Sequence, residues 1–244
     1  LHRLIRRQRQ MCIRDRKYAA IIAIILSSSF GLYTWMNNPE SQMVAVTVRA
    51  GSKAEMALPD GTFVHLNAAT NLEYDVNNSK QRLVKLSGEA FFDVAKNPDC
   101  PFKVIINDLQ IEVVGTSFNV KTYKKDIVET SLLSGRIRIS GGSLPHEYTL
   151  SPGQKATYSA MDRTLRISKA DAHVEAGWRD NYLIFESTPL IDVIAQIERW
   201  YGVEIRLHHK QIAQDLLSGS FRNESIQNVI RSLSIQYGFN YEIH

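Results

Sequence analysis

Glu89 and Asp93 are the residues of this 244-residue chain whose type and spacing come nearest to acid–base chemistry. Two carboxylates can act as proton donor and proton acceptor when their surroundings separate their pKa values. Here the two flank the run "AFF", in a segment that we expect to lead from a strand into a turn. Nothing around them marks an acid–base pair, so the support for catalysis is weak.

The histidines and cysteines do not form a metal site in the sequence. His65 stands inside a predicted strand without a partner at ligand spacing, which favours a structural or surface role. His208 and His209 lack the further ligands that zinc requires. Cys12 and Cys100 lack a CxxC spacing and are expected on opposite sides of a membrane. Hydrolase and nucleotide-binding signatures are also missing, so we expect no enzyme active site, no metal and no cofactor.

The positive charge of the chain is concentrated at its N-terminus. The formal net charge is +4 and the sequence pI is about 9.0, values that would suggest a nucleic-acid partner. Residues 1–17, however, hold seven basic residues and one acid; removing them from 29 basic and 25 acidic residues leaves 22 and 24. The remaining chain is therefore not a candidate for binding phosphates, and we expect no nucleic-acid partner.

The range 18–36 predicts a single transmembrane helix, because its nineteen residues carry no charge. At about 1.5 Å per residue such a helix spans roughly 28 Å, close to the ~30 Å hydrocarbon core. Tyr18 begins the segment, and Tyr33 and Trp35 lie at its far end, where interfacial aromatic residues are enriched. The preceding basic residues predict a cytoplasmic N-terminus, with residues 37–244 across the inner membrane. A cleaved signal peptide is the alternative, although no clear cleavage site follows.

The string "MCIRDR" at residues 11–16 resembles a translated sequencing adapter. If it is one, residues 1–16 are foreign to the native protein, and Lys17 alone remains of the basic flank. The predicted orientation then rests on less charge, and a native N-terminal region is missing.

Residues 43–168 predict an all-β domain. Short segments rich in β-branched residues, several with alternating apolar and polar positions, are typical of half-buried strands. They are 44–48, 63–66, 82–86, 102–106, 111–114, 118–123, 128–133, 136–140 and 163–168. Turn sequences such as "LPDGT" at residues 58–62 separate them. Strands at this spacing indicate a sandwich or barrel-like domain.

Residues 181–244 contain one small pattern twice. The stretch "FESTPLIDVIAQIERWYGVEI" recurs 36 positions later as "FRNESIQNVIRSLSIQYGFNYEI". Each copy predicts a strand, an amphipathic helix and a second strand, with the helices capped by Thr188 and Ser225 and ended by Gly202 and Gly238. We therefore expect a domain of two βαβ units, with residues 166–181 connecting it to the β-domain.

The doubled unit supplies the candidate partner-binding residues, and the face of helix 189–201 that carries Arg199 should be exposed. They are Asp192, Glu198, Arg199, Phe221 and Arg222. The strand edges of so small a domain could also accept a strand from a partner. A repeat that only stabilises the protein is the alternative.

Several motifs, in this order, resemble the FecR-type transmembrane sigma-factor regulators, or anti-sigma factors. They are "LPDGTFVHLNAATNLEYD", "VKLSGEAFFDVAKNPDCPFKV", "VVGTSFNVKTY", "LLSGRIRIS", "LSPGQKATYS", "FESTPLIDVIAQIERWYGVEI" and "LSGSFRNESIQNVI". Each is weak alone, but together and behind a membrane segment they are specific, and the resemblance covers about nine-tenths of the chain.

The resemblance implies a signalling chain. An outer-membrane TonB-dependent receptor for iron or glycan uptake presents a signalling domain in the periplasm. The regulator receives it and controls an extracytoplasmic-function (ECF) sigma factor across the inner membrane. The doubled unit, similar to the short secretin/TonB domain, would be the receiver. Residues 1–17 are too short for the family's cytoplasmic helical domain, so either the chain is a fragment or it does not itself hold a sigma factor.

The resemblance also implies a chemical step within "VVGTSF". Some members of the family cleave themselves at a Gly-Thr bond, by attack of the threonine hydroxyl on the preceding carbonyl. The corresponding residues here are Gly115 and Thr116, and glycine tolerates the strained backbone that favours such a shift. The alternative is a bulge at Gly115 with Thr116 in a strand.

Two other classes of protein stand beside the regulator. A periplasmic carbohydrate- or ligand-binding β-domain would need an aromatic-lined site, whereas Trp178 and Trp200 lie in or beside the repeat, where core packing is expected. A hydrolase would need a nucleophile that the sequence does not mark. We expect an α+β protein with one transmembrane helix, an all-β periplasmic domain and a C-terminal double βαβ domain.

Overall fold

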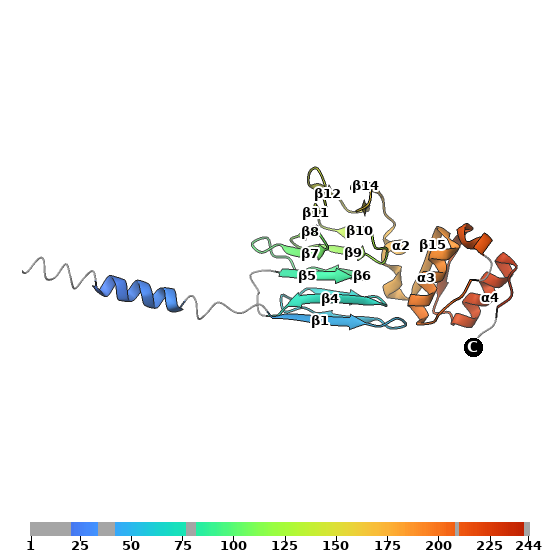
Figure 1. Cartoon of the computed structure of the whole chain (residues 1–244), viewed down its shortest axis with the longest axis horizontal. Helices are drawn as coiled ribbons and strands as arrows, with labels where there is room; N and C mark the ends of the chain where they lie inside the picture. Colours follow the sequence, from blue (N-terminus) through green and yellow to red (C-terminus); the bar gives the residue numbers. More distant parts are fainter. Residues whose placement is uncertain (1–20, 34–41, 77–81, 208–209, 242–244) are drawn as a thin grey trace, which may run out of the picture. The chain divides into compact units, whose positions relative to one another are not determined.

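The computed structural model describes residues 21–33, 42–76, 82–207 and 210–241 (Figure 1).

The chain separates into two units, residues 1–41 and residues 42–244. In the first, residues 21–33 are helical, so Tyr33 lies in a helix as predicted. Tyr18 and Trp35, the other predicted anchor residues, fall outside the described part. No helix in that part is long and apolar enough to cross a membrane.

Two seven-stranded sheets form most of the second unit (Figure 1). The first has the order β1 (Met43–Val48), β4 (Thr70–Asp75), β5 (Arg82–Ser87), β7 (Phe102–Ile106), β8 (Leu109–Val113), β11 (Ile137–Gly141) and β12 (Tyr148–Leu150). The second has the order β14 (Thr164–Lys169), β13 (Gln154–Ser159), β10 (Ile127–Ser134), β9 (Ser117–Lys121), β6 (Glu89–Asp93), β3 (Phe63–Leu66) and β2 (Ala54–Ala57). Neighbouring strands are antiparallel except β5 and β7, which are parallel.

The core lies between the two sheets, which form an open sandwich. Phe92 stacks on Phe118 with ring centroids 5.2 Å apart, and it meets Phe102 of the opposite sheet at 5.9 Å. All three are at most 1% exposed. The inward side chains of both sheets join them in one apolar cluster, which is what a sandwich requires. The sequence predicted this domain and nine of the fourteen strands that the two sheets contain. It missed β2, β4, β6, β12 and β13.

The β6 strand was missed because it is buried on both faces and so does not alternate. On its outer face, Phe91 packs against Ala176 and Trp178. These belong to α2 (Ala172–Ala176) and to the 3₁₀ helix η1 (Gly177–Asp180). The predicted connector 166–181 is therefore the end of β14 followed by two short helices that cover the sandwich.

The C-terminal domain has one two-stranded sheet and two helices around a single apolar core. In order, its elements are β15 (Tyr182–Pro189), α3 (Leu190–Tyr201), the 3₁₀ helix η2 (Lys210–Gln214), β16 (Leu216–Arg222) and α4 (Ile226–Tyr237). Both helices end as predicted, since Gly202 and Gly238 follow them with φ of +68°. Ser225 caps α4, but Pro189 stands at the cap of α3 without a side-chain bond, so the predicted cap at Thr188 is wrong.

The expected second strand of the first βαβ unit is absent, since residues 203–207 have no regular structure. Their amides are already bonded to the helix end: Val203 N donates to the Glu198 carbonyl at 3.2 Å, and Ile205 N donates to Glu198 Oε1 at 2.7 Å. Residues 239–241 are also irregular, and the end of the second copy lies outside the described part. Each repeat is thus a strand and a helix, and the two strands pair with each other.

Candidate functional site

The side chain of Glu89 lies at the centre of a buried polar network on β6. It is 7% exposed, and its two carboxylate oxygens accept bonds from Asn67 Nδ2 at 2.8 Å and Asn119 Nδ2 at 3.0 Å. Asn119 Oδ1 in turn accepts a bond from Trp178 Nε1 at 3.1 Å. We call these four residues the Glu89 network. A buried carboxylate is tolerated only with such donors, so the network joins two strands, a loop and η1 into one unit.

Asp93 does not join Glu89 in an acid–base pair. Four residues along a strand place the two about 13 Å apart, and Asp93 Oδ1 instead accepts a bond from Ser117 Oγ at 2.8 Å. The arrangement of Glu89 is that of a structural carboxylate held by amides.

The helix α3 packs against the sandwich beside this network. We call this contact the α3 seam: α3 and Gly202 on one side, residues 49–53, Tyr123 and Lys124 on the other. Lys53 Nζ lies 3.7 Å from the ring centroid of Trp200, and donates to the Trp178 carbonyl at 2.6 Å and to Asn181 Oδ1 at 3.0 Å. Burial lowers the pKa of Lys53 to about 8, partly opposed by the negative charge of Glu89.

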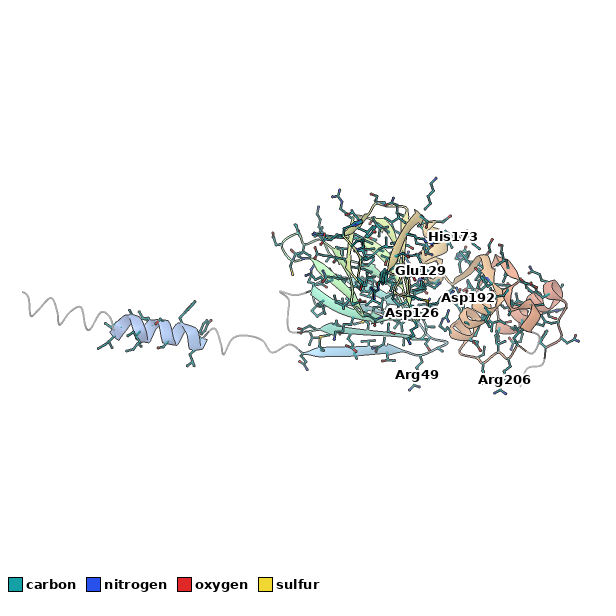
Figure 2. The ribbon with its side chains drawn as sticks, turned by 45° about the horizontal axis from the view of Figure 1, so that its top comes forward. Arg49, Asp126, Glu129, His173, Asp192 and Arg206 are labelled. Atoms are coloured by element: carbon teal, nitrogen blue, oxygen red, sulfur yellow. The ribbon has the colours of Figure 1, made fainter. Side chains whose placement is uncertain are left out.

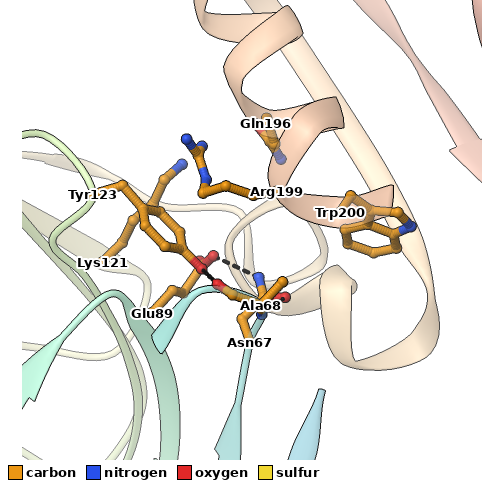
Figure 3. A pocket seen from close by; sticks show the side chains of 8 residues that line it. All are labelled: Asn67, Ala68, Glu89, Lys121, Tyr123, Gln196, Arg199 and Trp200. Atoms are coloured by element: carbon orange, nitrogen blue, oxygen red, sulfur yellow. Dashed lines mark hydrogen bonds between the residues drawn. The ribbon is translucent and has the colours of Figure 1, made fainter. Parts of the chain in front are cut away.

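Arg199 points from α3 onto the sandwich, as Figure 3 shows. Its guanidinium carbon lies 4.2 Å from the ring centroid of Tyr123, whose hydroxyl donates to the Ala68 carbonyl at 2.5 Å. Burial lowers the pKa of Arg199, while Tyr123 and nearby carboxylates raise it. Burial also raises the pKa of Tyr123, so the phenol stays neutral. A cavity of about 10 Å³ lies among these side chains, about the room that one buried water needs.

The predicted exposure of the polar face of α3 is therefore wrong. Arg199 is half-buried against Tyr123. Asp192, which Figure 2 labels, forms an ion pair with Lys124 at 2.7 Å. Glu198 bonds the chain that follows the helix. These three candidate partner-binding residues all make contacts within the chain, and two of them face the sandwich.

The other two candidate partner-binding residues lie at the end of β16. Phe221 is half-buried and meets Phe185 edge-on, with ring centroids 6.4 Å apart. Arg222 is exposed, and its guanidinium carbon lies 4.6 Å from the ring centroid of Tyr182. Of the five, Arg222 alone is classed as exposed and could meet a partner without rearrangement.

Gly115 and Thr116 lie where the chain crosses from β8 in the first sheet to β9 in the second. Thr116 is 3% exposed; its hydroxyl donates to the Arg136 carbonyl at 3.1 Å and accepts from the Arg136 amide at 3.4 Å. Gly135, with φ of +90°, packs so closely that a Cβ there would lie 2.7 Å from both the Gly115 carbonyl oxygen and Thr116 Oγ1. Thr116 is outside any strand, and its hydroxyl contacts the carbonyl and amide of Arg136.

The histidines that the sequence singled out are only partly described. His65 Nδ1 lies 3.1 Å from Glu55 Oε1, and its ring meets Phe63 edge-on. His208 and His209 fall outside the described residues. Within the described ranges, no group of three or more histidine, cysteine, aspartate and glutamate residues could hold a metal ion.

Sequence reasoning did not find Lys53 or Tyr123, and it did not predict the buried hydrogen bonds of Glu89 to two asparagine amides. A lone lysine in a turn and a lone tyrosine after a strand carry no local signal. Their role appears only because segments 125 residues apart, such as Lys53 and Trp178, meet in the fold.

Comparison with known proteins decides the family. The family described as FecR protein matches residues 44–138, and that described as FecR, C-terminal, matches residues 182–244. Two crystal structures of a candidate anti-sigma factor from Parabacteroides distasonis are each 30% identical to this chain, with TM-scores of 0.75. They cover 82% and 83% of this chain and 95% of their own. This chain belongs to the FecR family of anti-sigma factors. No curated protein matches the sequence.

The two matched segments of this FecR-type anti-sigma factor correspond to parts of the structure. Residues 44–138 supply most of the sandwich, including Glu89 and the residues that α3 contacts. Residues 182–244 are the C-terminal domain, which begins with β15. The α3 seam is thus a place where the two family segments meet. The partner of an anti-sigma factor is a sigma factor.

Proposed function

We propose that this FecR-type anti-sigma factor is the inner-membrane link between an outer-membrane TonB-dependent receptor and an ECF sigma factor. The N-terminus lies in the cytoplasm and residues 37–244 in the periplasm. The observation that carries the proposal is that residues 182–244 form a separate domain with its own core and its own family match, appended to the sandwich. A domain of that kind is suited to receive a partner.

The edge of β16 is the surface that best fits a receiver. In the described residues β16 pairs with β15 alone, so one side of its backbone has no strand beside it. Leu216, Ser218, Gly219 and Ser220 are all exposed, and none of them is charged or a proline. Natural edge strands usually carry charges or prolines that prevent pairing, and residues 216–220 carry neither. An extended segment of the receptor's signalling domain could add to it as a further strand.

Binding can be tested with the N-terminal signalling domain of the TonB-dependent receptor encoded beside this protein, by titration calorimetry. We expect wild-type chain to bind and a Ser218→Lys/Ser220→Lys variant to lose at least ~tenfold in affinity, because lysines on an edge strand oppose pairing. Thr164→Lys/Ser168→Lys, on the exposed edge strand β14, is the matched control and should bind like wild type.

The outcomes separate the proposals. Equal affinity in all three proteins would move the receiving surface away from β16 but keep the relay. No binding by wild type would overturn the receptor relay itself.

A further inference from the structure

The α3 seam brings two backbones into direct contact. Gly51 N donates to the Arg199 carbonyl at 2.8 Å. Gly51 and Gly202 have φ of +77° and +68°, and a Cβ on Gly202 would lie 3.1 Å from the Ala50 carbonyl oxygen and 3.3 Å from Gly51 Cα. A Cβ at either position would therefore crowd the opposite backbone, and both glycines adopt a left-handed backbone that other residues rarely take.

Charged side chains hold this contact on both flanks. Lys53 of the sandwich lies on the face of Trp200, and Arg199 of the helix lies on the face of Tyr123. In the first turn of α3, Asp192 forms an ion pair with Lys124 of the sandwich at 2.7 Å. Cations on aromatic faces are attracted more strongly where they are partly removed from solvent, and Arg199 and Trp200 are both half-buried. The seam is therefore held by several separate contacts along one helix.

The turn 49–53 directly continues β1, the first strand of the second unit. As an edge strand, β1 pairs only with β4 among the described strands. Its six residues span about 20 Å, from Val48 beside the turn to Met43, which follows the N-terminal unit in sequence. Edge strands with one neighbour open locally at low free-energy cost. A shift of α3 would act on the turn first and on β1 next.

We propose that the α3 seam is a latch that couples the position of the C-terminal domain to the pairing of β1. With the latch closed, Gly51 holds the end of α3 and β1 stays on the sheet; when α3 moves away, the turn is released and β1 loosens. The latch stands independently of the receptor relay. The direction in which it is used, from the C-terminal domain towards the N-terminal unit, rests on the proposed function.

Two glycines provide a matched test. Gly202→Ala and Gly238→Ala place the same methyl group after α3 and α4, at the same φ of +68°, so both carry the same backbone strain. Only Gly202 faces the turn, since no atom of the described residues lies within 4 Å of a Cβ on Gly238. As a second test, Lys53→Met removes a latch cation, with Lys85→Met, an exposed lysine of β5, as control.

Tryptophan fluorescence and hydrogen exchange are the measurements. In the 244-residue chain with Trp35→Phe, the remaining tryptophans are Trp200, which belongs to the latch, and Trp178, whose ring centroid lies 6.0 Å from Lys53 Nζ. We expect Gly202→Ala and Lys53→Met to shift their emission to the red and to speed exchange of the β1 amides by ~tenfold. Exchange in β12, the opposite edge of the same sheet, should not change. Both controls should match the parent protein.

Two results would overturn the latch. Emission and β1 exchange equal to those of the controls would show that α3 is not held by this contact. A red shift with unchanged exchange in β1 would show that the domain moves without acting on the strand. Because Lys53→Met introduces no backbone strain, it decides the matter if Gly202→Ala fails to fold.

Discussion

At the scale of single residues, this protein buries two charged side chains where its two domains meet, and each side chain is stabilised by a different kind of partner. Glu89 is held by neutral amides, whereas Lys53 has two oxygen acceptors and an aromatic face. Burial costs both groups the hydration of their charge. For Lys53 this cost appears as a lowered pKa, which makes the contact sensitive to pH.

The lowered pKa of Lys53 predicts how the stability of the folded chain depends on pH. Its pKa is about 8 when folded and 10.5 when unfolded, so between these values the folded chain binds fewer protons than the unfolded chain. The contribution of Lys53 to stability therefore rises with pH from about 8 to about 10.5. Urea unfolding of wild type and Lys53→Met measures this at about pH 7.5, below that window, and at about pH 9.5, inside it. We expect the difference, wild type minus variant, to grow at the higher pH; a constant or shrinking difference would contradict it.

The second prediction at this scale concerns self-cleavage of the chain at Thr116. We propose that the Thr116 hydroxyl attacks the Gly115 carbonyl, since close packing by Gly135 restrains both groups. The C–N bond of the peptide breaks, the nitrogen of Thr116 takes the hydroxyl proton and becomes a free amine, and an ester joins the two parts. Water then hydrolyses the ester and leaves a carboxylate on Gly115 and the free hydroxyl on Thr116. Purified wild type should then run as two fragments on a denaturing gel, Thr116→Ser should still cleave, and Thr116→Ala should stay intact. Thr130→Ala, which removes an equally buried hydroxyl, serves as control. A single band for wild type after long incubation would exclude cleavage.

At the scale of elements, the two repeats are held in different ways. The first turn of α4 is capped by Ser225, whose hydroxyl accepts a bond from Asn228 N at 3.3 Å. At α3, Thr188 belongs to β15 and its hydroxyl donates to the Glu186 carbonyl instead. The helix α3 is held by the sandwich through its polar face. One repeat therefore depends on local bonds and the other on tertiary contacts.

This difference between the two helix starts predicts that replacing the hydroxyl residue by alanine lowers the free energy of unfolding by unequal amounts. Ser225→Ala should lower the free energy of unfolding by about 1 kcal/mol, because it removes an N-cap. Thr188→Ala, at the corresponding place before α3, should cost clearly less, since that hydroxyl caps no helix. Denaturant unfolding followed by circular dichroism measures both. Equal costs would show that the cap geometry of the two helices is the same.

At the scale of the whole molecule, the α3 seam and the Glu89 network should make residues 42–244 unfold as one. A lysine and an arginine on opposite sides of the seam carry much of this connection. We expect one calorimetric transition for wild type and two for Lys53→Met/Arg199→Met, with the smaller C-terminal domain melting first. Lys85→Met should keep one transition. Two transitions in wild type would mean that the domains are independent.

The family and the local elements could be predicted from the sequence. Alternating apolar positions identified nine strands, and helical spacing identified both C-terminal helices to within a residue. These signals are local, because each depends on which face of an element is apolar and on where glycine permits a left-handed turn. Gly202 and Gly238 were predicted as helix ends for that reason.

Contacts between segments that are distant in the sequence could not be predicted and are seen only in the tertiary structure. Helical spacing shows that α3 has a polar face but not what covers it, so Arg199 and Asp192 were expected in solvent and lie against the sandwich. The same limit hid β6, which is buried on both sides, and the loss of the strand at residues 203–207. Burial of a polar group is decided by partners far along the chain, as Lys53 and Trp200 illustrate. The sequence by itself therefore determined the elements and the family, and the tertiary structure decided which polar residues hold the two domains together.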